Sequence, residues 1–278
     1  MVVAASGVSA RPPTLKLGEL TGVWAAVYQQ RQRLEAAADR SVITAWQDVA
    51  RGLDLDDVIT TVQQNSGTVG GDPAAAAARR RHLHQVTAAA VLARLTTLTR
   101  HRSWPGLIAA LAAALRRARA TGQRAGHAVV DDDEGALDDG DDQGDDAAQA
   151  TASAYDVAAA ALKALAATIA RQLLAAVTAG DAPSALAELV AGAVRAALAW
   201  TLVLSTAIGL AFNTGMRAAY TARDVVQFDF VTAGDSSVCT TCADAEDGNP
   251  YFASDVPVPP LHPNCRCSTQ PAQPGSED

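Results

Sequence analysis

The stretch RAALAWTLVLSTAIGLAFNTGMRAAYTARDVVQFDFVT, residues 195–232, contains the change of pattern that decides the fold. Its first part, 196–212, has no charged residue and is rich in alanine, which favours helix. From Val226 to Thr232 apolar and polar residues alternate instead, as they do on a half-buried strand. The sequence therefore predicts a long helix that gives way to a small β-containing module after residue 224.

Upstream of this boundary the chain has the composition of a helical protein. Alanine supplies much of its apolar fraction, and aromatic residues make up only 4% of the 278 residues. Patterns with three- and four-residue spacing, and helix-start signals at Asp72-Pro73 and Ser103, predict helices over 17–50, from 72 onward, and over 103–124, 151–178 and 184–220. We expect a mainly α fold of long alanine-rich helices with a small C-terminal α+β module.

Charge is distributed unevenly and divides the chain into segments. Residues 1–130 carry 16 Lys and Arg against 8 Asp and Glu, whereas 131–146 (DDDEGALDDGDDQGDD) hold ten acids and no base. A self-repelling run with so little to bury is typical of a linker. The predicted segments are a flexible arm (1–14), an N-terminal helical region (15–130), an acidic disordered linker (131–146), a second helical region (147–224) and a cysteine/histidine module with a tail (225–278).

The uncharged segment 196–212 is seventeen residues long, which is near the lower limit for a membrane span. It contains several Ala and Thr residues, and Arg195 and Arg217 lie close to its two ends. We therefore predict a buried core helix here and no membrane partner. A loop is predicted over 63–73 (QQNSGTVGGDP) from its Gly, Asn and Pro content.

All four cysteines lie after residue 238, in the pattern Cys239-Thr-Thr-Cys242 and His262-Pro-Asn-Cys265-Arg-Cys267. Disulfides of secreted domains are normally spread through a chain, so this clustering favours a metal. A C-x-x-C pair gives two thiolates to one ion, and a His or Cys pair from a distant segment completes a tetrahedron. We predict one structural zinc ion held by Cys239, Cys242, His262 and either Cys265 or Cys267. All-protein ligation leaves no open position for catalysis.

Other interpretations of these residues are weaker but remain open. Two disulfides would account for the same four cysteines in an oxidised particle. A redox role for the C-x-x-C pair is disfavoured because no βαβ pattern surrounds it. The loop between the two pairs is rich in proline, which disfavours regular structure. The remaining histidines are interpreted as surface residues: His82, His84, His101 and His127.

The module resembles the C-terminal end of phage head-morphogenesis (minor capsid) proteins similar to the F protein of phage Mu. The HPNCRC sequence is the most specific part of this resemblance, which extends over roughly 200–270. Many members carry a Thr-Glu dipeptide and an arginine in the preceding helix, where this chain has Thr206-Ala207 and Gly209-Leu210. The matching residues are 211–217 (AFNTGMR), 230–235 (FVTAGD), 238–242 (VCTTC), Gly248, Pro259-Pro260 and 262–267 (HPNCRC).

The resemblance implies a structural protein of the virion, in the capsid interior or near the portal, assembled in the host cytoplasm. The partners it implies are the portal and/or the major capsid or scaffold protein. The basic N-terminal region could also make weak contact with packaged DNA. The alternative is a capsid maturation protease or another head-associated hydrolase. Its candidate nucleophiles, Ser153, Ser184 and Ser205, lie in apolar helical contexts without a nearby histidine in the pattern, so we expect no enzyme activity.

Overall fold

A computed structural model of the chain describes most residues after residue 21. The described residues are 22–51, 53–65, 72–131, 133, 137, 147–179, 181, 183–196, 198–232, 238–263 and 265–272. The arm predicted over 1–14 lies outside these ranges, as does most of the acidic linker predicted over 131–146.

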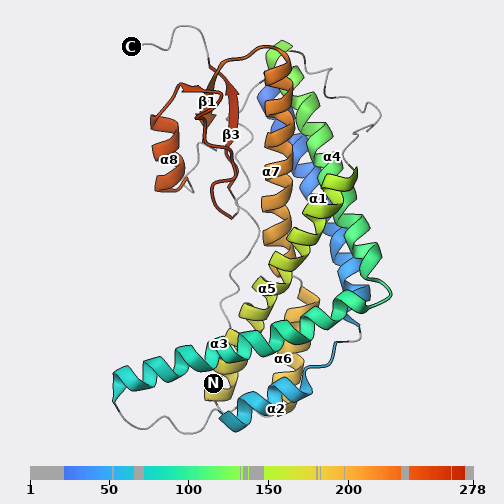
Figure 1. Cartoon of the computed structure of the whole chain (residues 1–278), viewed down its shortest axis with the longest axis vertical. Helices are drawn as coiled ribbons and strands as arrows, with labels where there is room; N and C mark the ends of the chain where they lie inside the picture. Colours follow the sequence, from blue (N-terminus) through green and yellow to red (C-terminus); the bar gives the residue numbers. More distant parts are fainter. Residues whose placement is uncertain are drawn as a thin grey trace. The chain divides into compact units, whose positions relative to one another are not determined.

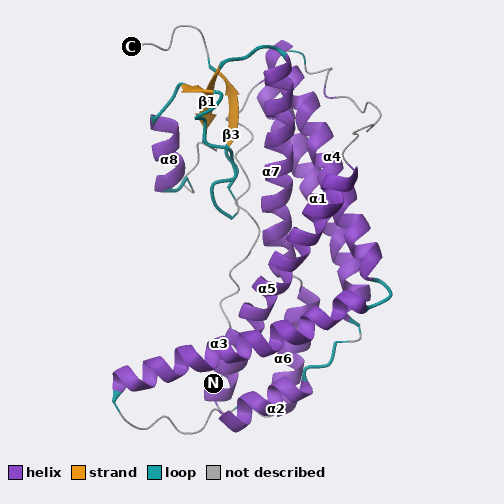
Figure 2. Ribbon diagram, in the orientation of Figure 1, coloured by secondary structure: helices purple, strands orange, loops and turns teal. Residues whose placement is uncertain are grey.

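Most of the described residues are helical, which confirms the mainly α prediction, and the strands form one small sheet (Figure 2). The α-helices are α1 (Gly22–Ala50), α2 (Asp56–Asn65), α3 (Pro73–Thr97), α4 (Trp104–Asp131), α5 (Ala147–Ala179), α6 (Pro183–Ala196), α7 (Leu198–Ala222) and α8 (Thr240–Asp247). A 3₁₀ turn, η2 (Leu98–Arg100), follows α3, and the strands are β1 (Gln227–Val231), β2 (Tyr251–Phe252) and β3 (Ser268–Pro271).

Several predicted boundaries need correction. Helix α2 was missed, and it extends to Asn65 into the segment predicted as a loop over 63–73. Helix α4 runs seven residues past the predicted end at Arg124, to Asp131. The predicted helix over 184–220 corresponds to α6 and α7, and residue 197 between them lies outside the described residues. The predicted start at Asp72-Pro73 is confirmed, because the Asp72 carboxylate accepts a hydrogen bond from the Ala75 amide at 3.1 Å.

The contacts within the chain divide it into two compact units. Unit 1 comprises Met1–Ala36, Ala114–Ala147 and Ser205–Asp278, and unit 2 comprises Ala37–Ala113 and Ala148–Leu204. Each unit therefore draws on sequence from both sides of the acidic run. The five segments inferred from composition stay a prediction.

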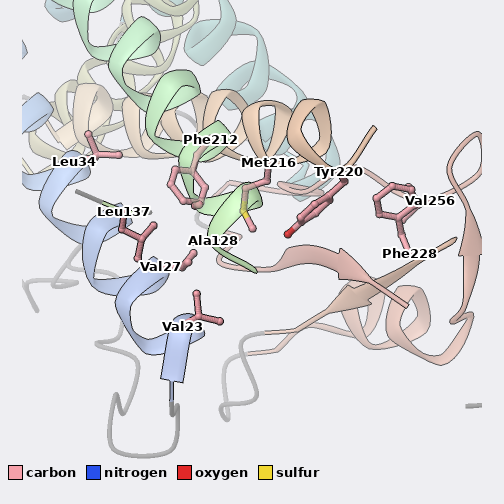
Figure 3. Packing of buried hydrophobic residues seen from close by; sticks show 11 residues of the cluster. Val23, Val27, Leu34, Ala128, Leu137, Phe212, Met216, Tyr220, Phe228 and Val256 are labelled. Carbon is pink, nitrogen blue, oxygen red and sulfur yellow. The ribbon is translucent and has the colours of Figure 1, made fainter. Parts of the chain in front are cut away.

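In unit 1, parts of α1, α4 and α7 lie side by side and share an apolar core with the small sheet (Figures 1 and 3). Figure 3 shows Phe212, Met216 and Tyr220 of α7 turned toward this core. The core also includes Leu137, the leucine within the acidic run, which is 9% exposed. The remaining buried members are Val23, Val27, Leu34, Ala125, Ala128, Phe228 and Val256.

Glycines allow α4 and α7 to approach each other closely. A Cβ added at Gly215 would collide with the Arg119 carbonyl oxygen, and one at Gly122 would collide with the Phe212 carbonyl. Both obstacles are backbone atoms of the facing helix, so neither can move aside without separating the helices. At the C-terminal ends of these helices, Arg223 donates two hydrogen bonds to the Asp131 carboxylate, at 2.7 and 2.8 Å.

The sheet has the strand order β2-β1-β3, and both neighbours of β1 are antiparallel to it. On β1, Phe228 and Phe230 are buried and the residues on either side of them are half-buried, which confirms the predicted alternation within the strand. Val226, at the start of the predicted alternation, lies before the strand and is 67% exposed. Helix α8 and strand β2 lie in the first part of the stretch between the two cysteine pairs, where the loop prediction was wrong. The rest of that stretch, 253–261, has no helix or strand, as predicted.

Unit 2 is held by apolar packing of a different kind. Helix α5 buries a long face that is mostly alanine with interspersed leucines. Trp46 and Trp200 are fully buried, and their rings pack at a tilt of 40° with centroids 5.1 Å apart. The Trp46 indole N–H donates to the Val194 carbonyl at 3.0 Å.

Within the described residues, two helical stretches are long and apolar enough to cross a membrane on length and composition alone. They are Ala147–Ala179, with mean hydropathy 1.4, and Ser184–Ala222, with mean hydropathy 1.6. The buried share of each apolar window is 44% and 43%. Core helices of globular proteins meet the same criteria, so the core-helix prediction for 196–212 stays a prediction.

Candidate metal centre

The C-x-x-C pair lies at the start of a helix rather than in a free loop. Cys239 is the N-cap of α8, and its sulfur accepts a hydrogen bond from the Cys242 amide at 3.4 Å. This hydrogen bond is the main reason that the pKa of Cys239 is lowered. Cys242 lies in the first turn of the helix with its side chain buried. The Cys239 sulfur therefore lies where a helix N-terminus favours thiolate.

His262 faces Cys242 from the other side of the centre. Its Nε2 atom is 3.2 Å from the Cys242 sulfur, and its Nδ1 atom is 2.9 Å from the Pro263 carbonyl oxygen. A carbonyl oxygen can only accept, so Nδ1 carries the proton of the neutral ring. Nε2 is then left as an unprotonated donor atom directed at the cysteines, which is how metal-binding imidazoles are commonly oriented.

Cys265 and Cys267 complete the cluster and both are buried. The Cys265 sulfur is 3.7 Å from the Cys242 sulfur. The five candidate ligands form two groups of three that share Cys242, and within each group the donor atoms lie within 4.8 Å of one another. One group is Cys239, Cys242 and His262, and the other is Cys242, Cys265 and Cys267.

These spacings fit a zinc ion. With Zn–S bonds of about 2.3 Å and Zn–N bonds of about 2.0 Å, a tetrahedral site has S···S edges of about 3.8 Å and S···N edges of about 3.6 Å. The two distances above, 3.7 and 3.2 Å, are close to these edges. All four cysteines are unbridged in this structure.

The cysteine thiols influence one another strongly because they share a buried space. The Cys267 thiol donates to the Cys265 sulfur, which lowers the pKa of Cys265 to about 5 and raises that of Cys267. Burial raises the pKa of Cys242 to about 12. Protein groups alone therefore stabilise a partly protonated cluster. Full deprotonation of this cluster requires a cation among the sulfurs, and a divalent metal supplies that charge.

Side chains of α1 hold the backbone on which the last two cysteines lie. The Arg31 guanidinium donates to the Cys265 carbonyl at 3.1 Å, and the Tyr28 hydroxyl donates to the Arg266 carbonyl at 3.3 Å. Arg31 is 5% exposed, and its Nε also pairs with Glu35 at 3.0 Å. Burial raises the pKa of Tyr28 to about 12, so its phenol stays protonated as a donor.

Side chains of α7 continue this row of donors. The Asn213 amide reaches the Cys267 carbonyl at 3.5 Å and accepts from the Ser268 hydroxyl at 2.9 Å. The Tyr220 hydroxyl donates to the Thr269 carbonyl at 3.1 Å. Four backbone carbonyls in the segment 265–269 thus accept hydrogen bonds from helix side chains. We call residues 265–269 the metal-ligand segment.

Residues at or just after the C-terminal end of α8 are hydrogen-bonded to β1 and to the residue that follows it. The Asn249 amide group exchanges hydrogen bonds with both the amide and the carbonyl of Phe230, at 2.6 and 2.9 Å. The Glu246 carboxylate accepts from the Thr232 amide and hydroxyl, at 2.9 and 3.0 Å. These contacts fix the end of α8, and therefore Cys239 and Cys242 at its start, relative to the sheet.

The structure brings together all five residues predicted as ligands, whereas their role in binding zinc stays a prediction. Sequence reasoning missed the supporting residues Tyr28, Arg31, Asn213 and Tyr220. Tyr28 and Arg31 belong to the apolar stripe of the predicted 17–50 helix, and a buried arginine in such a stripe is the signal that was available. The three candidate serines lie in different helices: Ser153 in α5, Ser184 in α6 and Ser205 in α7.

Comparison of the chain with protein-family models, with curated proteins and with solved structures finds no match.

Proposed function

We propose that the C-terminal module binds one structural zinc ion and that the chain is a minor capsid protein of phage heads. The observation that carries the zinc proposal is the convergence of three thiols and one imidazole on the Cys242 sulfur. Sulfur and imidazole nitrogen are the ligands that zinc prefers in structural sites. The zinc would link α8 to the metal-ligand segment. Its positive charge would also balance the negative charge of the cysteine thiolates, which the protein groups alone do not balance.

Cys265 is the better candidate for the fourth ligand. Its sulfur is 3.7 Å from that of Cys242, and its charge also acts on His262, whose pKa is raised mainly by the Pro263 carbonyl. Cys265 therefore lies near two members of the Cys239, Cys242 and His262 group. Cys267 interacts with Cys242 and Cys265, and its thiol then serves as a hydrogen-bond donor to a ligand sulfur.

Zinc analysis of protein prepared in reducing buffer tests the metal proposal. We expect one equivalent of zinc in the wild type and in Cys267→Ser, and little in Cys265→Ser or Cys239→Ser. Less than about half an equivalent of zinc, together with four oxidised thiols, would support disulfides instead. Zinc retained by Cys265→Ser and lost by Cys267→Ser would reverse the assignment of the fourth ligand.

A role in head morphogenesis is supported by the resemblance of the FVTAGD, VCTTC and HPNCRC motifs to phage minor capsid proteins. A closed ligand set favours a structural rather than a catalytic role for the centre. We propose that the chain contacts the portal, the major capsid protein or the scaffold, and that it is located in the virion near the portal. The helices supply long faces for such contacts.

Affinity-tagged chain, produced together with the portal, scaffold and coat proteins encoded by neighbouring genes, tests this role. We expect the portal or coat protein to co-purify and the coat protein to remain uncleaved. Cleavage of coat protein that is abolished by substitution of Ser153, Ser184 or Ser205 would instead support a maturation protease. Neighbouring genes without head functions would remove the basis of the proposal.

A further inference from the structure

Helix α3 carries a strong positive charge and has no acidic residue of its own, although Arg94 pairs with Asp57 of α2 at 2.7 Å. Between residues 73 and 130 the chain has ten arginines and no Asp, Glu or Lys. Six of these arginines lie on α3, on η2 or in the turn that follows, all within unit 2. They are Arg79, Arg80, Arg81, Arg94, Arg100 and Arg102, and all six are exposed.

The N-terminal half of α3 extends beyond the core of unit 2. On one face of the helix, Leu95 and Val91 are 0% exposed and Thr87 is 2% exposed. Two turns before Thr87 the same face presents Arg80, which is exposed, with the half-buried His84 between them. Figure 1 shows these first turns extending past α2 and α6. Ala76 in the first turn is buried, but most side chains from 73 to 85 are exposed, so much of the helix surface is accessible here.

We propose that this projecting end of α3 binds double-stranded DNA through its phosphate backbone, without reading sequence. Arg79, Arg80 and Arg81 follow one another at steps of about 100° around the helix, so their side chains can reach phosphates on both sides of a groove. An α-helix about 10–12 Å wide fits the major groove of B-DNA, which is about 12 Å wide. Arginine suits phosphate because its planar guanidinium can donate two parallel hydrogen bonds.

Other polyanions fit this end of the helix less well. A membrane-surface helix needs a broad apolar face with aromatic anchors. Helix α3 contains no Phe, Trp or Tyr, and Val86 is its one large apolar side chain that is strongly exposed. Duplex RNA has a deep, narrow major groove that does not admit a helix. The proposal is independent of the zinc centre, since it rests on residues of unit 2.

The test is binding of the zinc-loaded full chain to a DNA duplex of about 20 base pairs, measured over a range of salt concentrations. We expect the logarithm of the affinity to fall linearly with the logarithm of salt. The double variant R80Q/R81Q should lower the affinity at least about tenfold at low salt and reduce the salt slope by about 1.8, since each phosphate contact contributes about 0.9. Glutamine is a good helix former, so the helical circular dichroism should not change.

The matched control is R116Q/R117Q, which removes two adjacent exposed arginines from α4 and changes the net charge equally. We expect this control to lower the DNA affinity less than about twofold. An equal loss in both double variants would overturn the proposal, because net charge and not α3 would then govern binding. Equal affinity for an RNA duplex, or tighter binding to phosphatidylserine vesicles with the same sensitivity to R80Q/R81Q, would also overturn it.

Discussion

Unit 1 and unit 2 are built from similar alanine-rich helices, but different interactions hold them together. In unit 2, apolar surfaces such as the alanine face of α5 and the packed Trp46 and Trp200 rings form the interior. In unit 1, an apolar core is supplemented by backbone contacts at glycines and by side chains that donate to the metal-ligand segment. Buried hydrogen bonds of this kind tolerate little displacement. A donor or acceptor that loses its partner stays buried and unsatisfied, which lowers the stability of the folded state.

Because the metal-ligand segment belongs to unit 1, loss of the metal should destabilise unit 1 more than unit 2. Cys242 belongs to both groups of candidate ligands, so Cys242→Ser should abolish zinc binding and unfold the module. This is the largest expected effect, since structural zinc contributes about 10–16 kcal/mol of apparent binding free energy in small modules. Loss of the metal-ligand segment would also remove the partners of Tyr28, Arg31 and Tyr220. Hydrogen exchange should therefore accelerate in α7 between 205 and 222 and change little in α5.

Chelation of zinc from the wild type is the control, and it should reproduce the exchange pattern of Cys242→Ser. Cys267→Ser is the matched variant that keeps the metal. Equal acceleration in α5 and α7 would contradict the division into two separately stabilised units. A full equivalent of zinc in Cys242→Ser would contradict the central position of that sulfur.

The second comparison is between Gly215, which lies against the backbone of the facing helix α4, and Gly192, which has no such neighbour. In Gly215→Ala the new Cβ would collide with the Arg119 carbonyl oxygen and would lie 2.8 Å from the Gln123 nitrogen. Because both are backbone atoms of α4, the helices must separate, and we expect a loss of about 2–3 kcal/mol in the free energy of unfolding. Urea denaturation followed by circular dichroism measures this loss.

Gly192→Ala in α6 is the matched control. A Cβ there has no neighbouring atom within 4 Å, and alanine favours helix over glycine, so a gain of about 0.5–1 kcal/mol is expected. A similar small gain in Gly215→Ala would mean that α4 and α7 are not in close contact in solution.

A smaller effect is expected for Arg31, which donates a hydrogen bond to the metal-ligand segment. Arg31→Met keeps an apolar stem but leaves the buried Cys265 carbonyl without this donor, which should cost about 1–3 kcal/mol. The variant should also give up zinc to a competing chelator more readily, because the segment that carries Cys265 is less well ordered. Arg33 lies two residues along the same helix and is exposed, so Arg33→Met should change stability by less than about 0.5 kcal/mol. Zinc retention that is identical in the two variants would show that Arg31 serves helix packing alone.

The sequence was sufficient to predict the helical class, most helix positions and the five candidate ligands, because each depends on local pattern. The C-x-x-C and H-x-x-C-x-C spacings identified these candidates without any knowledge of their neighbours in space. The structure places the sulfurs of both Cys265 and Cys267 close to that of Cys242.

The supporting contacts could not be predicted because they join residues far apart in the chain. Arg31 and Cys265 are separated by 234 positions, and Asn213 and Ser268 by 55. Helix α2 was missed for a local reason, since its ten residues are too few for a clear three- and four-residue pattern. Helix α8, which Cys239 caps, was missed as well, because the proline content of the stretch between the two cysteine pairs predicted a loop there.

The smallest predicted effect isolates one hydrogen bond within unit 2. Trp46 and Trp200 are both 0% exposed and pack against each other, so replacing either by phenylalanine removes a similar volume from the same place. The Trp46 N–H donates to the Val194 carbonyl, whereas the Trp200 N–H has no acceptor among the described residues. Both substitutions leave a cavity that lowers the free energy of unfolding. Trp46→Phe also removes a buried hydrogen bond, whereas Trp200→Phe removes a donor that has no acceptor. We expect Trp46→Phe to be less stable than Trp200→Phe by about 1 kcal/mol in urea denaturation. Equal losses would indicate that the Trp200 N–H also has an acceptor, and that buried polar contacts matter to unit 2 as they do to unit 1.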